Sequence, residues 1–157
     1  MKVEDVPRSA TCTRRSIALR DLLTRASGDS RASWLDVLDS PGIYVVQLDH
    51  DISLEFLETC GLASHATPWA VKELRAKHER IHQSSSTDIL YLGKGDNIRK
   101  RVQQLARFGV GRADNHVGGE WLWQVARASE ATVVMQSTPR GKQVPFEGWL
   151  LETFFAA

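Results

Sequence analysis

Three short apolar runs, at residues 42–48, 88–93 and 131–136, constrain the fold of this chain more than any other feature. Each is rich in β-branched, aromatic or aliphatic residues; a Pro-Gly step opens the first, and a glycine ends the second. Runs of this length and composition, bounded by turn residues, are typical of buried strands rather than helices. The intervening stretches are longer and carry helical patterns. The sequence therefore predicts an α/β (α+β) fold with a small central three-stranded, mainly antiparallel sheet flanked by helices.

Helical periodicity is found on both sides of the first run. In residues 14–26, four aliphatic side chains fall roughly on one side of a helix, which predicts an amphipathic helix near the N-terminus. A charged helix is expected from Pro68 to about His82, because proline suits a first helical turn. This helix lies within a long insertion, at about residues 49–87, between the first two strands.

Two more helices follow the second strand. Asp96 or Asn97 can cap a helix that ends near Phe108-Gly109, and residues 145–155 predict a final helix. We therefore expect a helical N-terminal segment over residues 1–40 and a domain over residues 41–157 that carries the insertion.

The charge balance excludes a strongly basic protein. The chain has 20 Lys and Arg against 19 Asp and Glu, a net charge of +1, so composition alone gives no support for nucleic-acid binding. Within 157 residues no stretch approaches the ~20 apolar residues of a membrane-spanning helix, and the acidic start lacks the pattern of a secretory signal. We expect a cytoplasmic protein without a membrane partner.

The segments PGIYVVQL and ILYLGKGDNIRKRV carry a more specific signal. They resemble the two signature strands of the GIY-YIG nuclease superfamily, with Gly42-Ile43-Tyr44 as the first tripeptide and Tyr91-Leu92-Gly93 as the second. The resemblance continues with Arg101 in the following helix and with Glu147 before a pair of aliphatic residues, and it covers roughly residues 41–155. It implies a metal-dependent endonuclease that hydrolyses DNA phosphodiester bonds, with Tyr44, Tyr91, Arg101 and Glu147 as catalytic residues.

These residue types suit phosphodiester cleavage, which needs a group that activates water and a group that stabilises negative charge. Tyr91 ends a strand at a glycine-rich turn, and Tyr44, on the paired strand, can orient the water or Tyr91. The guanidinium of Arg101 can place two donors on a phosphate. A core tyrosine at position 44 and a salt bridge of Arg101 remain the alternative interpretations.

Glu147 is the predicted metal ligand. Leu150, Leu151 and Phe154 follow it at i+3, i+4 and i+7, which puts its carboxylate on the apolar face of the last helix, where it needs a partner. We expect a single Mg²⁺ or Mn²⁺ ion, held by one carboxylate, water and phosphate oxygens. Leu105 stands where family members often have a histidine, which leaves Tyr91 or metal-bound hydroxide as the base.

Basic residues cluster between the second strand and the following loop, where they form either a solvated helix face or an anion-binding patch. Besides Arg101, the predicted substrate-binding residues are Lys94, Arg99, Lys100, Arg107 and His116. The predicted partner is DNA, with a partner protein or domain as a further expectation. Trp121 and Trp123 either stack on bases or belong to the core. A second interpretation stays open: a weakly active or inactive domain of this type that binds nucleic acid or a protein, since no asparagine follows the glutamate helix.

Overall fold

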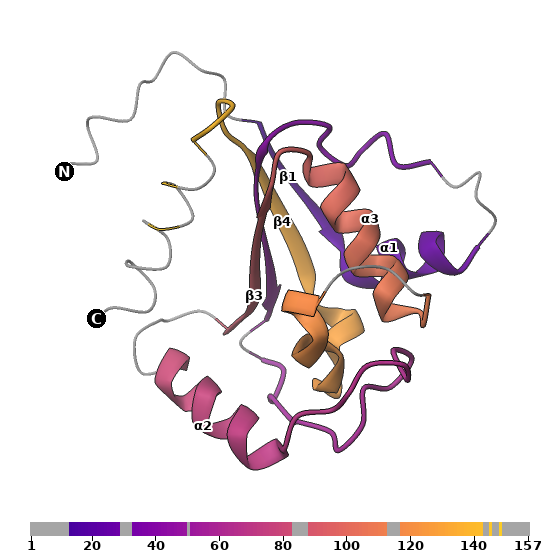
Figure 1. Ribbon diagram of the computed structural model, residues 1–157, viewed down its shortest axis with the longest axis vertical. Helices are drawn as coiled ribbons and strands as arrows, with labels where there is room; N and C mark the ends of the chain where they lie inside the picture. Colours follow the sequence, from indigo (N-terminus) through magenta and orange to yellow (C-terminus); the bar gives the residue numbers. More distant parts are fainter. Residues whose placement is uncertain are drawn as a thin grey trace.

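A four-stranded sheet forms the centre of the protein, as seen in a computed structural model that describes residues 13–28, 33–49, 51–82, 88–112, 117–142, 145 and 148 (Figure 1). The strands are hydrogen-bonded in the order β1-β4-β2-β3, and each pair is antiparallel. The elements, in chain order, are β1 (Arg14–Ala18), α1 (Leu19–Ser27), β2 (Gly42–Leu48), α2 (Val71–His82), β3 (Asp88–Gly95), α3 (Ile98–Gly109), the 3-10 segments η2 (Val117–Gln124) and η3 (Ala128–Glu130), and β4 (Thr132–Ser137). The predicted α/β fold is confirmed, and the sheet has one strand more than expected.

The additional strand is β1, at a position where the sequence predicts helix from residue 14. Arg14 to Ala18 pair with β4, and the helix begins only at Leu19. The first three residues of β1 are exposed, so they gain little from a helical apolar face, whereas the ladder with β4 satisfies their backbone groups. Charged side chains are also typical of an edge strand. The N-terminal segment thus contributes a strand and a helix to the same sheet and core as the rest of the chain.

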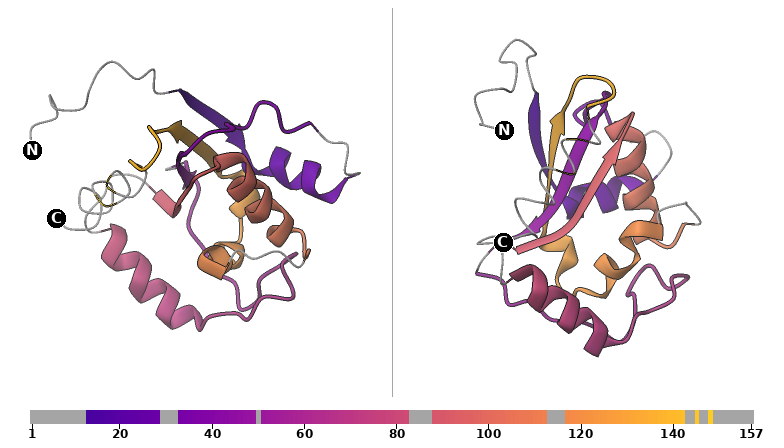
Figure 2. Two further views of the ribbon diagram at one scale, coloured as in Figure 1. Left: turned by 45° about the horizontal axis from the view of Figure 1, so that its top comes forward. Right: turned by 60° about the vertical axis from the view of Figure 1, so that its left-hand side comes forward.

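Both α1 and α3 lie on one side of the sheet and pack against each other (Figures 1 and 2). Of the two predicted caps of α3, Asp96 and Asn97, the structure has Asn97: its side chain accepts a hydrogen bond from the backbone N–H of Lys100, at 3.0 Å. The buried face of α3 carries Ile98, Val102 and Leu105, all fully buried in the core. This face fixes α3, and the turn that joins it to β3, to the hydrophobic core.

The insertion between β2 and β3 begins as a loop and ends in α2, which lies at one end of the sheet (Figure 1). Gln124 anchors the loop. Its fully buried side-chain amide donates to the backbone oxygens of Leu57, at 3.0 Å, and Trp69, at 2.9 Å, and accepts from the Trp69 N–H at 2.7 Å. One satisfied polar side chain thus fixes two distant points of the insertion on η2.

The predicted helix over residues 145–155 lies outside the described residues apart from positions 145 and 148, which are helical. In the described part of the chain, no helix has both the length and the apolar character needed to cross a membrane.

Candidate functional site

The register of β2 and β3 brings the two signature tyrosines together. Tyr44 pairs with Gly93, and Val46 pairs with Tyr91, so both tyrosines project from the same face as diagonal neighbours. Their ring centroids lie 5.9 Å apart with the planes inclined at 44°. Tyr44 is fully buried and Tyr91 is half-buried. Of the two tyrosines, Tyr91 is therefore the more accessible to solvent.

Two glycines make room for this cluster. A Cβ atom at Gly93 would lie 2.5 Å from the Tyr44 hydroxyl and still closer to its ring, and a Cβ atom at Gly95 would lie 2.6 Å from Cγ of Arg101. Neither glycine has a positive φ, so the requirement is for space rather than for an unusual backbone conformation. The sequence interpretation did not assign these roles, although a glycine inside a strand indicates a close approach by another group.

Arg101 extends from α3 toward the same cluster. Its stem lies against Gly95, its Nη1 donates to Oε1 of Gln104 at 2.8 Å, and the side chain is half-buried. Gln104 is one helical turn away, at i+3, which is the spacing that lets two side chains on a helix meet. The sequence interpretation did not identify this partner. Arg101 is thereby held beside Tyr44 rather than extended into solvent.

The environment of Tyr44 keeps its hydroxyl protonated. Burial is the largest cause that raises the pKa of Tyr44 well above its ordinary value, and the nearby Tyr91 raises it further. The charge of Arg101 acts in the opposite direction, as does its hydrogen bond to Tyr44. The hydrogen bond with Tyr91 raises the pKa of Tyr44 as well. The structure thus joins three of the four predicted catalytic residues through one phenolic oxygen.

Arg99, a predicted substrate-binding residue, is held by internal contacts. Its Nε and Nη2 donate to the carbonyl of Val37, at 3.1 and 3.0 Å, and its Nη1 lies 3.1 Å from Oδ2 of Asp39. Asp39 also accepts from the side chain of Asn97 at 2.5 Å. These bonds fasten the chain before β2 to the first turn of α3.

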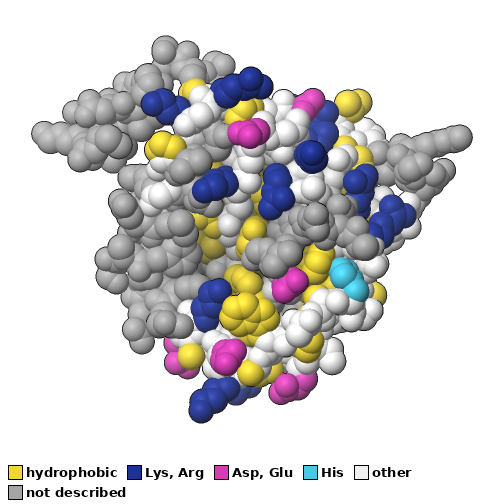
Figure 3. Space-filling view, in the orientation of Figure 1, with side chains coloured by type: hydrophobic (Ala, Val, Ile, Leu, Met, Phe, Trp, Pro, Cys, Tyr) yellow, Lys and Arg dark blue, Asp and Glu magenta, His cyan; other side chains and the backbone are white. Residues whose placement is uncertain are grey.

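The other predicted cations lie in different places. Lys94 pairs with Ile43, one step along from Tyr44, so strand alternation directs it to the opposite face of the sheet. Lys100 and Arg107 are seven residues apart on α3 and lie on its outer side, with Lys100 exposed and Arg107 half-buried. Lys and Arg side chains are spread over the upper part of the face shown in Figure 3. The structure does not gather these cations into one cluster around the tyrosines.

Glu147 and His116, the remaining predicted site residues, lie outside the described residues. Within the described ranges there is no group of three or more His, Cys, Asp or Glu side chains that could hold a metal ion. The predicted Mg²⁺ or Mn²⁺ rests on the single carboxylate of Glu147 and stays a prediction.

The two tryptophans of η2 have different environments. Trp123 is 6% exposed and its ring lies against Gly109 at the end of α3, which is a core position. Trp121 is only half-buried. Trp123 is therefore a core residue, as one of the two interpretations predicts, whereas Trp121 is partly accessible to solvent.

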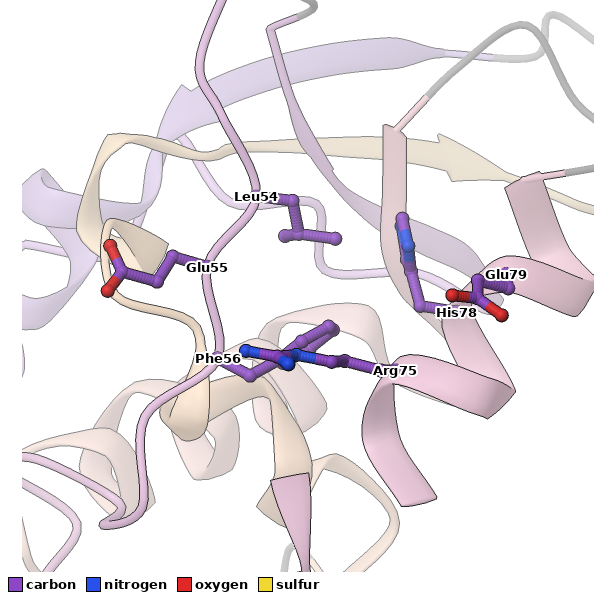
Figure 4. A pocket seen from close by; sticks show the side chains of 6 residues that line it. All are labelled: Leu54, Glu55, Phe56, Arg75, His78 and Glu79. Atoms are coloured by element: carbon purple, nitrogen blue, oxygen red, sulfur yellow. The ribbon is translucent and has the colours of Figure 1, made fainter. Parts of the chain in front are cut away.

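A hollow of about 400 Å³ lies between the insertion loop and α2 (Figure 4). Arg75 reaches from α2 toward Phe56, while the carboxylate of Glu55 points away from α2. The hollow is lined by Leu54, Glu55, Phe56, Arg75, His78 and Glu79. None of these residues belongs to the tyrosine–arginine cluster.

No family model matches the chain, and no curated protein or solved structure matches it.

Proposed function

We propose that this chain is a metal-dependent endonuclease of the GIY-YIG type that hydrolyses DNA phosphodiester bonds. The observation that carries the proposal is the meeting of Tyr44, Tyr91 and Arg101 at one hydroxyl, in the space left by Gly93 and Gly95. The three side chains come from two strands and a helix, and all of them belong to the two segments that resemble the family's signature.

Each side chain has a distinct task in the proposed reaction. Tyr44 keeps its proton, so it serves as a hydrogen-bond donor that orients the oxygen of Tyr91. Tyr91, the more accessible phenol, contacts the attacking water and takes part in its proton transfer. Arg101 remains charged at any working pH and places its guanidinium against the negative charge that develops on the phosphate.

Glu147 is assigned to the divalent ion in this proposal. Bound there, Mg²⁺ or Mn²⁺ would supply positive charge to the scissile phosphate. The position of the glutamate on the apolar face of its predicted helix is the support for this role.

Cleavage of supercoiled plasmid tests the proposal. The intact protein should convert plasmid to the nicked form with Mg²⁺ or Mn²⁺ and not with EDTA. Arg101→Met should lower the rate about 100-fold, as loss of one transition-state donor does in other enzymes. Glu147→Ala should abolish the nicking that Mg²⁺ or Mn²⁺ supports. Arg20→Met removes an exposed arginine from α1 and should leave the rate unchanged, which makes it a control for net charge.

A second function remains open, because the complete burial of Tyr44 is also what a core tyrosine would show. In that case the chain binds nucleic acid or a protein without cutting. The absence of metal-dependent nicking by the intact protein, or nicking by the Glu147→Ala and Arg101→Met variants at the rate of the intact protein, would reject the endonuclease and favour this second function.

A further inference from the structure

Two tryptophans and a lysine form a cluster where the insertion meets η2, outside the tyrosine site. The ammonium of Lys77, on α2, lies 5.3 Å from the ring centroid of Trp69 and 5.8 Å from that of Trp121. Both distances are within the range of a cation–π interaction. We call Trp69, Lys77 and Trp121 the tryptophan–lysine platform.

Trp69 is exposed although its backbone is fixed. Its side chain is 44% exposed, while its N–H and carbonyl are both hydrogen-bonded to the buried amide of Gln124. A tryptophan presented on a fixed backbone loses little conformational entropy when a ligand covers it. Lys77 lies over one face of the indole, and 44% of the Trp69 surface remains exposed to a ligand.

The surface around the platform suits a small flat ligand. Figure 3 shows hydrophobic side chains beside both basic and acidic ones on the lower part of the molecule, where α2 lies. Exposed residues of α2 include Lys72 and Arg75 but also Glu73 and Glu79, so the helix is not a strong phosphate-binding surface. A stable protein interface needs about 800 Å² on each partner. One exposed indole with a cation close to its ring fits a single nucleobase and its phosphate better.

We infer that the tryptophan–lysine platform binds unpaired nucleotides, with a base stacked on Trp69 and the adjacent phosphate near Lys77. This inference rests on the proposed function and names its substrate class: DNA that contains an unpaired segment. Stacking does not depend on sequence and adds affinity that a chain of net charge +1 cannot obtain from phosphate contacts alone.

Fluorescence anisotropy with a labelled oligothymidine, and with a duplex of equal length, tests the platform without divalent metal. The full-length protein should bind the single strand more tightly than the duplex. Trp69→Ala should weaken single-strand binding about 10-fold, within the range found for loss of one stacked aromatic side chain. Trp69→Phe keeps a ring for stacking and should stay within about threefold of the intact protein.

Two variants of the same insertion serve as matched controls. Leu62→Ala removes another exposed apolar side chain, 72% exposed against 44% for Trp69, and Lys72→Met removes a lysine of α2 that is not part of the platform. Both should bind the single strand like the intact protein, whereas Lys77→Met should bind it more weakly. Thermal unfolding of each variant confirms that it is folded.

Unchanged single-strand binding by Trp69→Ala would refute the inference that the platform binds unpaired nucleotides. An equal loss of affinity for Trp69→Phe and Trp69→Ala, or tighter binding of the duplex than of the single strand, would refute it as well. Failure of the two proposals is distinguishable because this assay contains no metal and the plasmid assay does. If the chain nicks plasmid but Trp69→Ala binds normally, the platform alone fails. If the chain does not nick but binds the single strand through Trp69, the endonuclease alone fails.

Discussion

Replacing Gly93 with alanine should displace Tyr44 while leaving every side chain of the tyrosine cluster chemically unchanged. The new methyl group would lie 2.5 Å from the Tyr44 hydroxyl and closer to its ring, and Tyr44 is fully buried, so the ring has no solvent to move into. Either the ring or the β2–β3 pairing must shift. In both cases Tyr44 moves away from Tyr91 and Arg101.

The magnitude follows from two opposing effects. Alanine restricts the unfolded chain and suits a strand better than glycine, which stabilises the folded state by about 0.5–1 kcal/mol. Overpacking a well-filled core costs about 1–3 kcal/mol. The net loss in the free energy of unfolding should be about 1–2 kcal/mol, or a fall of about 2–8 °C in Tm for a chain of this size.

Gly109→Ala provides the matched control, because it overpacks a different aromatic ring. A Cβ atom there would lie 2.6 Å from Cζ2 of the buried Trp123, at the far end of α3 from the tyrosine cluster. Urea unfolding should show a similar loss of stability for Gly109→Ala and Gly93→Ala. Plasmid nicking, measured at a temperature where both are folded, should fall at least 10-fold for Gly93→Ala alone, since a small misplacement of a catalytic group has effects of this size or more.

Equal nicking by Gly93→Ala and the intact protein would refute the role given to Tyr44, because the hydroxyl cannot stay in place beside the added methyl group. An unchanged free energy of unfolding would refute the close packing itself.

Three further predictions concern stability and pH. Gln124→Leu removes three hydrogen bonds to the insertion backbone and should lower the free energy of unfolding by about 3 kcal/mol in urea; a loss of less than 1 kcal/mol would mean that water replaces the amide. Arg99→Met should lower the free energy of unfolding by about 1–2 kcal/mol, and by less at high salt. Adding Asp39→Ala should lower it little further, since the two side chains are paired; fully additive losses would argue against the pairing. Because the pKa of Tyr44 is raised in the folded state, its protonated phenol makes a favourable contribution to the free energy of unfolding. This contribution is present below the unfolded tyrosine pKa of about 10 and is lost as pH rises beyond it. Of the two tyrosines in the chain, Tyr44→Phe leaves only Tyr91, so the late step in the phenolate absorbance should disappear and alkaline stability should improve; an unchanged titration would contradict the burial of that hydroxyl.

Elements with strong local signals were predictable from the sequence. The strand at residues 42–48 has the predicted bounds, because a Pro-Gly start and a continuous apolar run agree on a buried strand. Helix α3 begins after the predicted Asn97 cap and ends at Gly109, since cap and periodicity agree there as well. The pairing of the two tyrosine strands was predicted through the family resemblance and not from a local pattern.

Features that depend on long-range pairing were not predictable in this way. Residues 14–18 lie on the edge of the sheet because β4 is available to pair with them, and no local pattern in RRSIA specifies that partner. Helix α2 starts at Val71, three residues after the predicted Pro68, because Gln124 binds the backbone of Trp69 and holds it outside the helix. In both cases tertiary contacts override local propensity.

The placement of the predicted cations also bears on how the proposed enzyme selects DNA. Arg99 is bonded to Val37 and Asp39, and Lys94 lies on the sheet face opposite Tyr44, which leaves Lys100 and Arg107 on the outer side of α3. Duplex binding gains its affinity from many phosphate contacts, and its salt dependence grows with their number. Because few of the predicted cations that the structure describes are gathered near the tyrosines, we expect weakly salt-dependent binding in which unpaired bases, rather than backbone charge, direct the substrate to the site.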